Sequence, residues 1–145
     1  MANEAQFKRG TQKTVSTTIG AISNNAISAL VGSYTSADTN DYPDAEFVLK
    51  VTFGTAPTEN ATIDLHVRPM NIQSTNDHEA PDATYRPHYL GSFVVNNVTT
   101  AQYLRCVGRD LPKEGDLYLF NNATGQATSA NAELYMTPLT LGPAA

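Results

Sequence analysis

Hydrophobic and polar residues alternate along the chain from residue 45 to residue 53. The apolar positions in this run are Ala45, Phe47, Leu49, Val51 and Phe53, and the residues between them are polar except Val48. Successive side chains of a strand point to opposite faces of a sheet, so this period of two predicts a half-buried β-strand. Turn-forming residues precede the run and follow it.

A second alternating run covers residues 62–69. Its apolar positions, Ile63, Leu65 and Val67, are predicted to face the core. The polar positions between them, including Asp64 and His66, are predicted to face solvent. Pro69 lacks a backbone donor and is expected to end the strand.

Shorter runs of the same kind cover residues 88–95, 102–107, 116–121 and 131–137. Gly, Pro or Asn residues bound each run, and Pro138 is expected to end the last one. Short strands separated by turns every 8–12 residues are typical of an antiparallel sandwich or barrel. With 145 residues, the chain has the length of one domain, and its six inward positions from Phe47 to Val67 are the predicted core.

The N-terminal part of the chain is ambiguous. Val15, Ile19, Ile22, Ala26 and Leu30 are spaced as on one face of a helix. Gly20, Asn24, Asn25 and many Thr and Ser residues favour extended backbone or turns, so strands are the preferred interpretation and a helix stays open. Phe7 is the only large apolar residue before Val15. We therefore expect residues 1–14 to form an attachment arm and residues 15–145 to form the sandwich domain.

The charge is distributed unevenly. Residues 1–37 contain Lys8, Arg9 and Lys13 against one acidic residue, a balance of +2, while residues 38–145 carry −7, which gives the net charge of −5. An acidic body repels a phosphate backbone, so nucleic acid is not an expected partner. The basic arm could contact an acidic protein surface.

Residues 71–87 are predicted to form a long surface loop. His78, with Asp77, Glu79, Asp82 and His88, is the best candidate for a metal site, but the ligand spacing on a loop broken by Pro is unlike that of a zinc site. The residues also lack the EF-hand pattern of a calcium loop. A solvated polar loop is the preferred interpretation, and we expect no metal and no cofactor.

No pattern in the sequence points to catalysis. There is no nucleophile elbow and no phosphate-binding glycine loop. Cys106, the single cysteine, excludes an internal disulfide and lies in an apolar run, where a buried, inert thiol is expected. Asp64 and His66 lie two residues apart on one strand face, but outward-facing polar residues explain them equally well. The chain is expected to bind rather than to catalyse.

Seven tyrosines and no tryptophan are present. Tyr85 and Tyr89 flank Pro87, and a cleft lined by them and Tyr34 would suit a sugar ligand. Tyrosines at the rim of a sandwich or at a protein interface are the preferred interpretation.

Two observations concern localisation. No apolar run approaches the 18 residues that a membrane-spanning helix requires. The first ten residues have no apolar stretch of the kind found in secretory signals, so synthesis in a cytoplasm is expected.

Several segments together resemble small structural proteins of tailed bacteriophage virions. They are residues 42–45 before the first alternating strand, residues 63–69, Leu90-Gly91-Ser92-Phe93-Val94, Leu111-Pro112 and residues 120–125. The similarity covers roughly residues 40–138. It implies an all-β, antiparallel jelly-roll-like β-sandwich in a capsid decoration or cement protein, without catalytic residues.

The resemblance does not decide where in the virion the protein lies, and a capsid decoration protein is the preferred interpretation. The protein would lie on the capsid exterior, bind the major capsid protein and form a homo-oligomer, most simply a trimer on a symmetry axis. Its partner-binding residues would be Phe7, Lys8, Arg9 and Lys13 of the arm, together with Tyr85 and Tyr89. The alternative is a tail- or fibre-associated module that binds a glycan or receptor through the tyrosine-rich loop.

Overall fold

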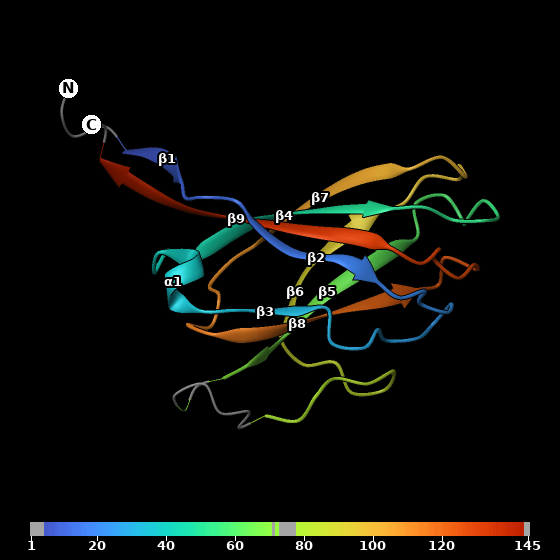
Figure 1. Ribbon diagram of the computed structural model, residues 1–145, viewed down its shortest axis with the longest axis horizontal. Helices are drawn as coiled ribbons and strands as arrows, with labels where there is room; N and C mark the ends of the chain where they lie inside the picture. The colour runs from blue at the N-terminus through green and yellow to red at the C-terminus, as the bar shows by residue number, and fades with distance from the viewer. Residues whose placement is uncertain (1–4, 71, 73–77, 144–145) are drawn as a thin grey trace.

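The computed structural model describes residues 5–70, 72 and 78–143, and the regular structure in this part of the chain is nearly all β (Figure 1). One short helix interrupts the strands. In chain order, the elements are β1 (Ala5–Arg9), β2 (Lys13–Ile19), β3 (Gly32–Tyr34), α1 (Ser36–Thr39), β4 (Asp44–Val51), β5 (Thr62–Pro69), β6 (Tyr89–Val94), β7 (Gln102–Gly108), β8 (Gly115–Asn122) and β9 (Ala132–Pro143).

The strands form two antiparallel sheets that pack face to face. The first sheet has the order β1-β9-β4-β7, and β2 also pairs with β9 on the side of β1. The second sheet has the order β3-β8-β5-β6. In Figure 1 the first sheet forms the upper layer and the second forms the lower layer. The protein is thus an antiparallel jelly-roll-like β-sandwich, as the sequence and the resemblance predict.

The core lies between the two sheets and contains the residues that alternation selects. All six predicted positions are at most 2% exposed: Phe47, Leu49, Val51, Ile63, Leu65 and Val67. In the first sheet, β9 supplies the neighbours of the β4 side chains, with Met136 opposite Phe47 and Leu134 opposite Leu49. Burial of these side chains is the main stabilising contribution to the fold.

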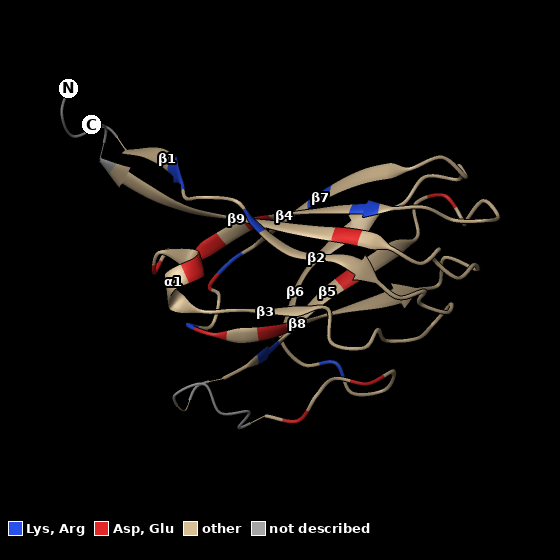
Figure 2. Cartoon of the chain, viewed as in Figure 1, with Lys and Arg blue, Asp and Glu red and all other residues tan. Residues whose placement is uncertain are grey.

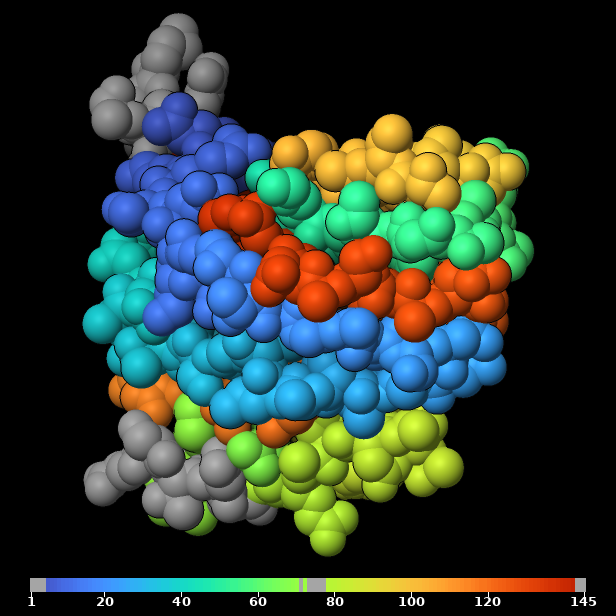
Figure 3. Space-filling view, turned by 45° about the vertical axis from the view of Figure 1, so that its right-hand side comes forward, coloured from blue at the N-terminus to red at the C-terminus, as the bar shows by residue number. Residues whose placement is uncertain are grey.

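One side of the sandwich is closed by a close approach of β2 and β3, one from each sheet. A Cβ atom on Gly32 would lie 2.7 Å from Val15 Cγ1 and 2.8 Å from the Val15 carbonyl oxygen, so only glycine allows this approach. Residues 25–31 continue the pairing with β8 beyond β3, through the hydrogen bonds Ser28 N–H to Leu119 O and Val31 N–H to Leu117 O. Figure 3 shows this face, on which the blue and light-blue N-terminal segments run side by side.

The N-terminal segment is extended, as preferred, and not helical. β1 pairs with residues 139–143 of β9, and β2 pairs with residues 132–136. Residues 5–9 are therefore held by β9 rather than free, and the boundary expected after residue 14 falls inside β2. All β1 side chains are exposed or half-buried, so β1 adds nothing to the core.

The last strand does not end at Pro138, which corrects the prediction. β9 continues through this residue to Pro143. The Pro138 carbonyl accepts a hydrogen bond from Gly10 N–H, 2.8 Å away. In an antiparallel strand the N–H and C=O of one residue point the same way, so the donor that Pro138 lacks faces the break between β1 and β2.

None of the helices in the described ranges is long and apolar enough to cross a membrane.

The first prediction tests the alternation that defines the core. Phe47→Ala removes a fully buried ring and leaves a cavity, so the free energy of unfolding should fall by about 3–5 kcal/mol. Urea unfolding of the wild type and the variant measures this difference. A loss below about 1 kcal/mol would mean that Phe47 does not lie in the core.

Candidate functional site

The outer face of the second sheet carries polar residues that are not exposed. Asp64 and His66 of β5 point to this face, as the alternation predicts, but they are only 8% and 4% exposed. The expectation that they face solvent is therefore wrong. The segment of residues 78–88 covers them. The central guanidinium carbon of Arg86 lies 3.7 Å from the centroid of the Phe120 ring, and His88 O accepts a hydrogen bond from Val67 N–H. Figure 1 shows this segment below the second sheet.

The Asp64 carboxylate is satisfied by its own sheet. One oxygen accepts a hydrogen bond from Ser92 Oγ at 2.7 Å, and the other accepts one from Asn122 Nδ2 at 3.0 Å. Ser92 has a single hydroxyl proton, so the Tyr89 hydroxyl must donate to Ser92 Oγ, 2.6 Å away. The carboxylate thus orders the Tyr89 side chain through one serine.

His66 lies beside this network without joining it. Neither ring nitrogen has a hydrogen-bond partner of normal geometry, and the Tyr89 ring packs edge-on at 5.8 Å between centroids. Burial lowers the pKa of His66; the charge of Asp64 opposes this shift, Arg86 adds to it, and the nearby Pro87 carbonyl opposes it weakly. Asp64 and His66 therefore do not form a hydrogen-bonded acid–base pair.

A second polar group lies at the other end of β5. Arg68 donates two hydrogen bonds to one carboxylate oxygen of Asp116, and Ser33 Oγ donates to the other. The Arg68–Asp116 pair is largely buried, with side chains 15% and 6% exposed. This pair joins neighbouring strands of the second sheet and is internal to the protein.

The three tyrosines considered for sugar binding differ in exposure. Tyr85 and Tyr89 are 49% and 57% exposed, as a binding role requires. Tyr34 is fully buried and its hydroxyl donates to Pro112 O at 2.8 Å, so it does not line an exposed cleft with Tyr85 and Tyr89, the feature that would have favoured sugar binding. Asp82 orders the turn before Tyr85 by accepting hydrogen bonds from Thr84 N–H and Tyr85 N–H.

The candidate metal ligands in the described part of the chain form no group that could hold a metal ion. Within residues 5–70, 72 and 78–143, no group of three or more His, Cys, Asp or Glu side chains is placed to hold a metal ion. His78 and His88 do meet, edge to face at 5.2 Å between ring centroids. Asp77 lies outside the described residues.

The thiol of Cys106 is buried, as the apolar run predicts. Burial raises its pKa to about 12, against a smaller opposing effect of Arg105. The thiolate, which is the reactive form, is thus not populated near neutral pH.

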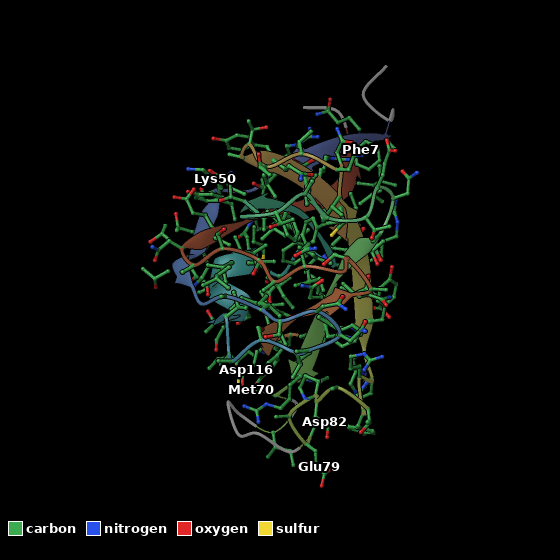
Figure 4. All side chains as sticks on the ribbon, turned by 90° about the vertical axis from the view of Figure 1, so that its right-hand side faces the viewer. Phe7, Lys50, Met70, Glu79, Asp82 and Asp116 are labelled. Carbon is green, nitrogen blue, oxygen red and sulfur yellow. The ribbon has the colours of Figure 1, made fainter. Side chains whose placement is uncertain are left out.

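Within the described part of the chain, an exposed apolar pair lies at the end of the first sheet that β1 and the end of β9 form. We call β1 and residues 139–143 of β9 the terminal ribbon; β4 begins opposite Leu139, so the ribbon extends past it. Phe7 lies directly opposite Leu141, and both are 62% exposed. Figure 4 places Phe7 at the opposite end of the molecule from Glu79 and Asp82.

The basic residues predicted for the arm are separated by the structure. Lys8 points to the other face of β1 from Phe7, and its aliphatic part lies against Gly142. Lys13 is paired with Asp38 of α1 at 2.9 Å. Only Arg9 remains on the Phe7 face, where it approaches Glu46 at 3.8 Å.

Two arginines from the body join Arg9, and the sequence reasoning missed them. Arg105 of β7 donates to Glu46 at 2.7 Å, and Arg109 approaches Asp44 at 3.8 Å. Tyr103, Arg105 and Val107 alternate along β7, and Arg109 follows the strand at the same spacing. This period of two was the signal that could have placed them on one face. Figure 2 shows the basic residues of β1, in blue, and the acidic residues, in red, along the sheets.

Comparison with known proteins gives distant likenesses. No family model matches the chain, and no curated protein sequence matches it. The CBM36-1 domain of a multidomain xylanase from the hindgut metagenome of Trinervitermes trinervoides is 16% identical, with 98% of this chain and 99% of that chain covered and a TM-score of 0.48. CsCBM6-3 from Clostridium stercorarium, solved with cellobiose, is 13% identical, with coverages of 96% and 94% and a TM-score of 0.39.

A capsid structure is among the similar chains as well. The acidic stable capsid of Helicobacter pylori bacteriophage KHP30 contains a chain that is 8% identical, with coverages of 97% and 100% and a TM-score of 0.35. At these identities and TM-scores we draw no function from the likenesses.

The second prediction concerns the buried histidine. The folded pKa of His66 is lowered, so folding stability should be complete above the ordinary pKa of 6.5 and should fall at lower pH, where the unfolded chain takes up a proton that the folded chain excludes. The slope contributed by one such group is at most about 1.4 kcal/mol per pH unit. Urea unfolding between pH 7.5 and about 5.5 measures it, since carboxylates titrate mostly below this range.

His66→Gln is the matched variant, because it removes the titration and leaves the other two histidines in place. Its free energy of unfolding should depend less on pH than that of the wild type over this range. Equal slopes for the two proteins would show that His66 is not held neutral by burial.

Proposed function

We propose that the protein is a structural component of a bacteriophage virion that decorates the capsid exterior by binding the major capsid protein. The observation that carries the proposal is the exposed pair Phe7 and Leu141 on the terminal ribbon. Isolated exposed apolar residues are ordinary on protein surfaces. A cross-strand pair on a ribbon beyond the sandwich is what a partner surface would cover.

Three further features support this proposal. The carboxylates of Asp64 and Asp116 on the outer face of the second sheet are engaged within the protein, whereas the terminal ribbon has exposed apolar groups and basic residues beside it. The ribbon is an edge of the first sheet, and an edge strand can pair with another chain. The resemblance noted in the sequence implies the same kind of role. In a trimer, three ribbons would bind one shell at once, and this multivalency would raise the overall affinity above that of a single ribbon.

The third prediction tests the ribbon by deletion. Deleting residues 1–10 removes β1 but leaves β2 and the Lys13–Asp38 pair intact, unlike a deletion to residue 14. Because β1 adds nothing to the core, the melting temperature should change by less than about 4 °C. Co-sedimentation with particles of the phage that encodes the chain should show strongly weakened binding.

Point variants provide the control for this experiment. Phe7→Ser should weaken particle binding about tenfold or more, because burial of a Phe side chain contributes about 1.5–3 kcal/mol. Leu30→Ser replaces another half-exposed apolar residue, outside the ribbon, and should bind like the wild type. Full binding by the deletion variant would exclude the ribbon as the attachment surface, and a large fall in melting temperature would make β1 part of the stable sandwich.

A second candidate function is glycan or receptor binding by a tail or fibre module. The ordered, half-exposed ring of Tyr89 and the neighbouring Tyr85 favour it, since flat aromatic rings suit the apolar faces of sugars. Arg109 lies beside both this surface and the terminal ribbon. The two functions are therefore tested with variants of Tyr89 and Phe7, each of which belongs to one surface.

The fourth prediction concerns this candidate. If the surface binds glycans, an array of bacterial surface oligosaccharides should detect the wild type and not Tyr89→Ala. Tyr103→Ala is the control, because Tyr103 is a 69% exposed tyrosine on the first sheet. No binding by the wild type, or equal binding by both variants, would exclude a glycan site at Tyr89.

A further inference from the structure

A small hollow lies on the outer face of the first sheet, at the base of the terminal ribbon. Its volume is about 110 Å³, and three arginines and three apolar side chains line it: Phe7, Arg9, Arg105, Val107, Arg109 and Leu139. The register explains the gathering, because Arg9 lies opposite Leu139 and Val107 lies opposite Glu46. Strands β1, β9 and β7 and the residue after β7 all contribute.

The hollow has more positive than negative charge. Within the described residues, its three guanidinium groups meet two carboxylates, those of Glu46 and Asp44. A single oxygen of Glu46 faces both Arg9 and Arg105. The arginine side chains are 58–70% exposed, and each guanidinium has five N–H donors, so donors remain for another acceptor. This basic spot belongs to a chain whose net charge is −5.

The size of the hollow limits what can enter it. Sites for small molecules and cofactors have volumes of about 300–1,000 Å³, several times that of this hollow. One aliphatic side chain fits such a space with a carboxylate beside it at the exposed arginines, and an oligosaccharide or a nucleotide does not. The apolar wall formed by Phe7, Val107 and Leu139 would cover an aliphatic group while the arginines bind an anion beside it.

We propose that this hollow binds a segment of a partner protein in which an Asp or Glu side chain lies next to an aliphatic side chain. The proposal rests on the proposed function and adds to it the chemistry of the shell segment that the ribbon meets. Planar guanidinium groups pair with carboxylates through two parallel hydrogen bonds, and the apolar wall accounts for the second side chain. A phosphate backbone has no group for that wall and is repelled by the acidic body.

Peptides test the chemistry without the particle. The probe is a blocked peptide, Gly-Asp-Leu-Asp-Gly, added to the ¹⁵N-labelled full chain while NMR shifts of the arginine Nε–H groups and the β1 and β7 amides are recorded. Saturable shifts at these positions are expected. Gly-Asn-Leu-Asn-Gly, Gly-Asp-Gly-Asp-Gly and inorganic phosphate should each bind about tenfold more weakly or not at all.

Variants locate the binding. Arg105→Gln with Arg109→Gln should weaken peptide binding by up to about 25-fold, since each exposed ion pair contributes up to about fivefold in affinity. Lys50→Gln removes a positive charge from the same face of the sheet, four residues along β4 from Glu46, and should bind the peptide normally. Three results would overturn the inference: phosphate causes shifts equal to those of the acidic peptide, the acidic peptide causes no shifts, or Lys50→Gln weakens peptide binding as much as the double arginine variant does.

The particle experiment separates this inference from the proposed function. If the wild type sediments with particles and the double arginine variant sediments equally well, the hollow is not the contact, although the shell-binding function stands. If the wild type fails to sediment with particles while the peptide binds at the hollow, the proposed function fails and the site remains. If the wild type binds both the peptide and the particles and the double variant binds neither, the inference and the proposed function are supported together.

Discussion

The length of β9 is the constraint on which the rest of the structure depends. This strand has 12 residues, whereas its partner β4 has eight and begins opposite Leu139. Its first part carries core residues such as Leu134 and Met136, so its position is fixed by burial. Residues 140–143 then have only β1 as a partner, and at about 3.3 Å per residue they extend roughly 13 Å past β4. The strand that completes the core therefore also carries the terminal ribbon.

The two sheets use their polar residues differently. On the second sheet, the acidic groups Asp64 and Asp116 are buried and bonded to neighbouring strands, and the segment of residues 78–88 covers much of the face. On the first sheet, Glu46 pairs with two exposed arginines and Asp44 pairs with a third. A buried charged group needs an oppositely charged partner within the protein. An exposed guanidinium group can exchange water for a partner at a small cost in desolvation free energy. The proposed attachment surface therefore lies at the end of the first sheet, where the charged groups are exposed.

Alternation in the sequence predicted most of the strands and the core, because burial on one face of a sheet imposes a period of two. It could not predict the environment of His66, since alternation identifies the face on which a side chain lies and not what covers that face. Tyr34 shows the same limit: the acceptor of its hydroxyl is the carbonyl of Pro112, 78 residues away in the sequence. The spacing of Arg105 and Arg109 could have predicted one wall of the hollow. The other wall depends on the pairing of β1 with the end of β9, which no local pattern specifies.

The central claim is that the protein attaches to a capsid shell through the terminal ribbon. A cryo-electron microscopy map of the parent particle, at a resolution that distinguishes strands, tests it most directly. The account predicts density for the sandwich on the capsid exterior, with β1 and the end of β9 against the shell and the segment of residues 78–88 directed away from it. Density at the tail, or contact with the shell through residues 78–89 while the ribbon faces solvent, would contradict the account.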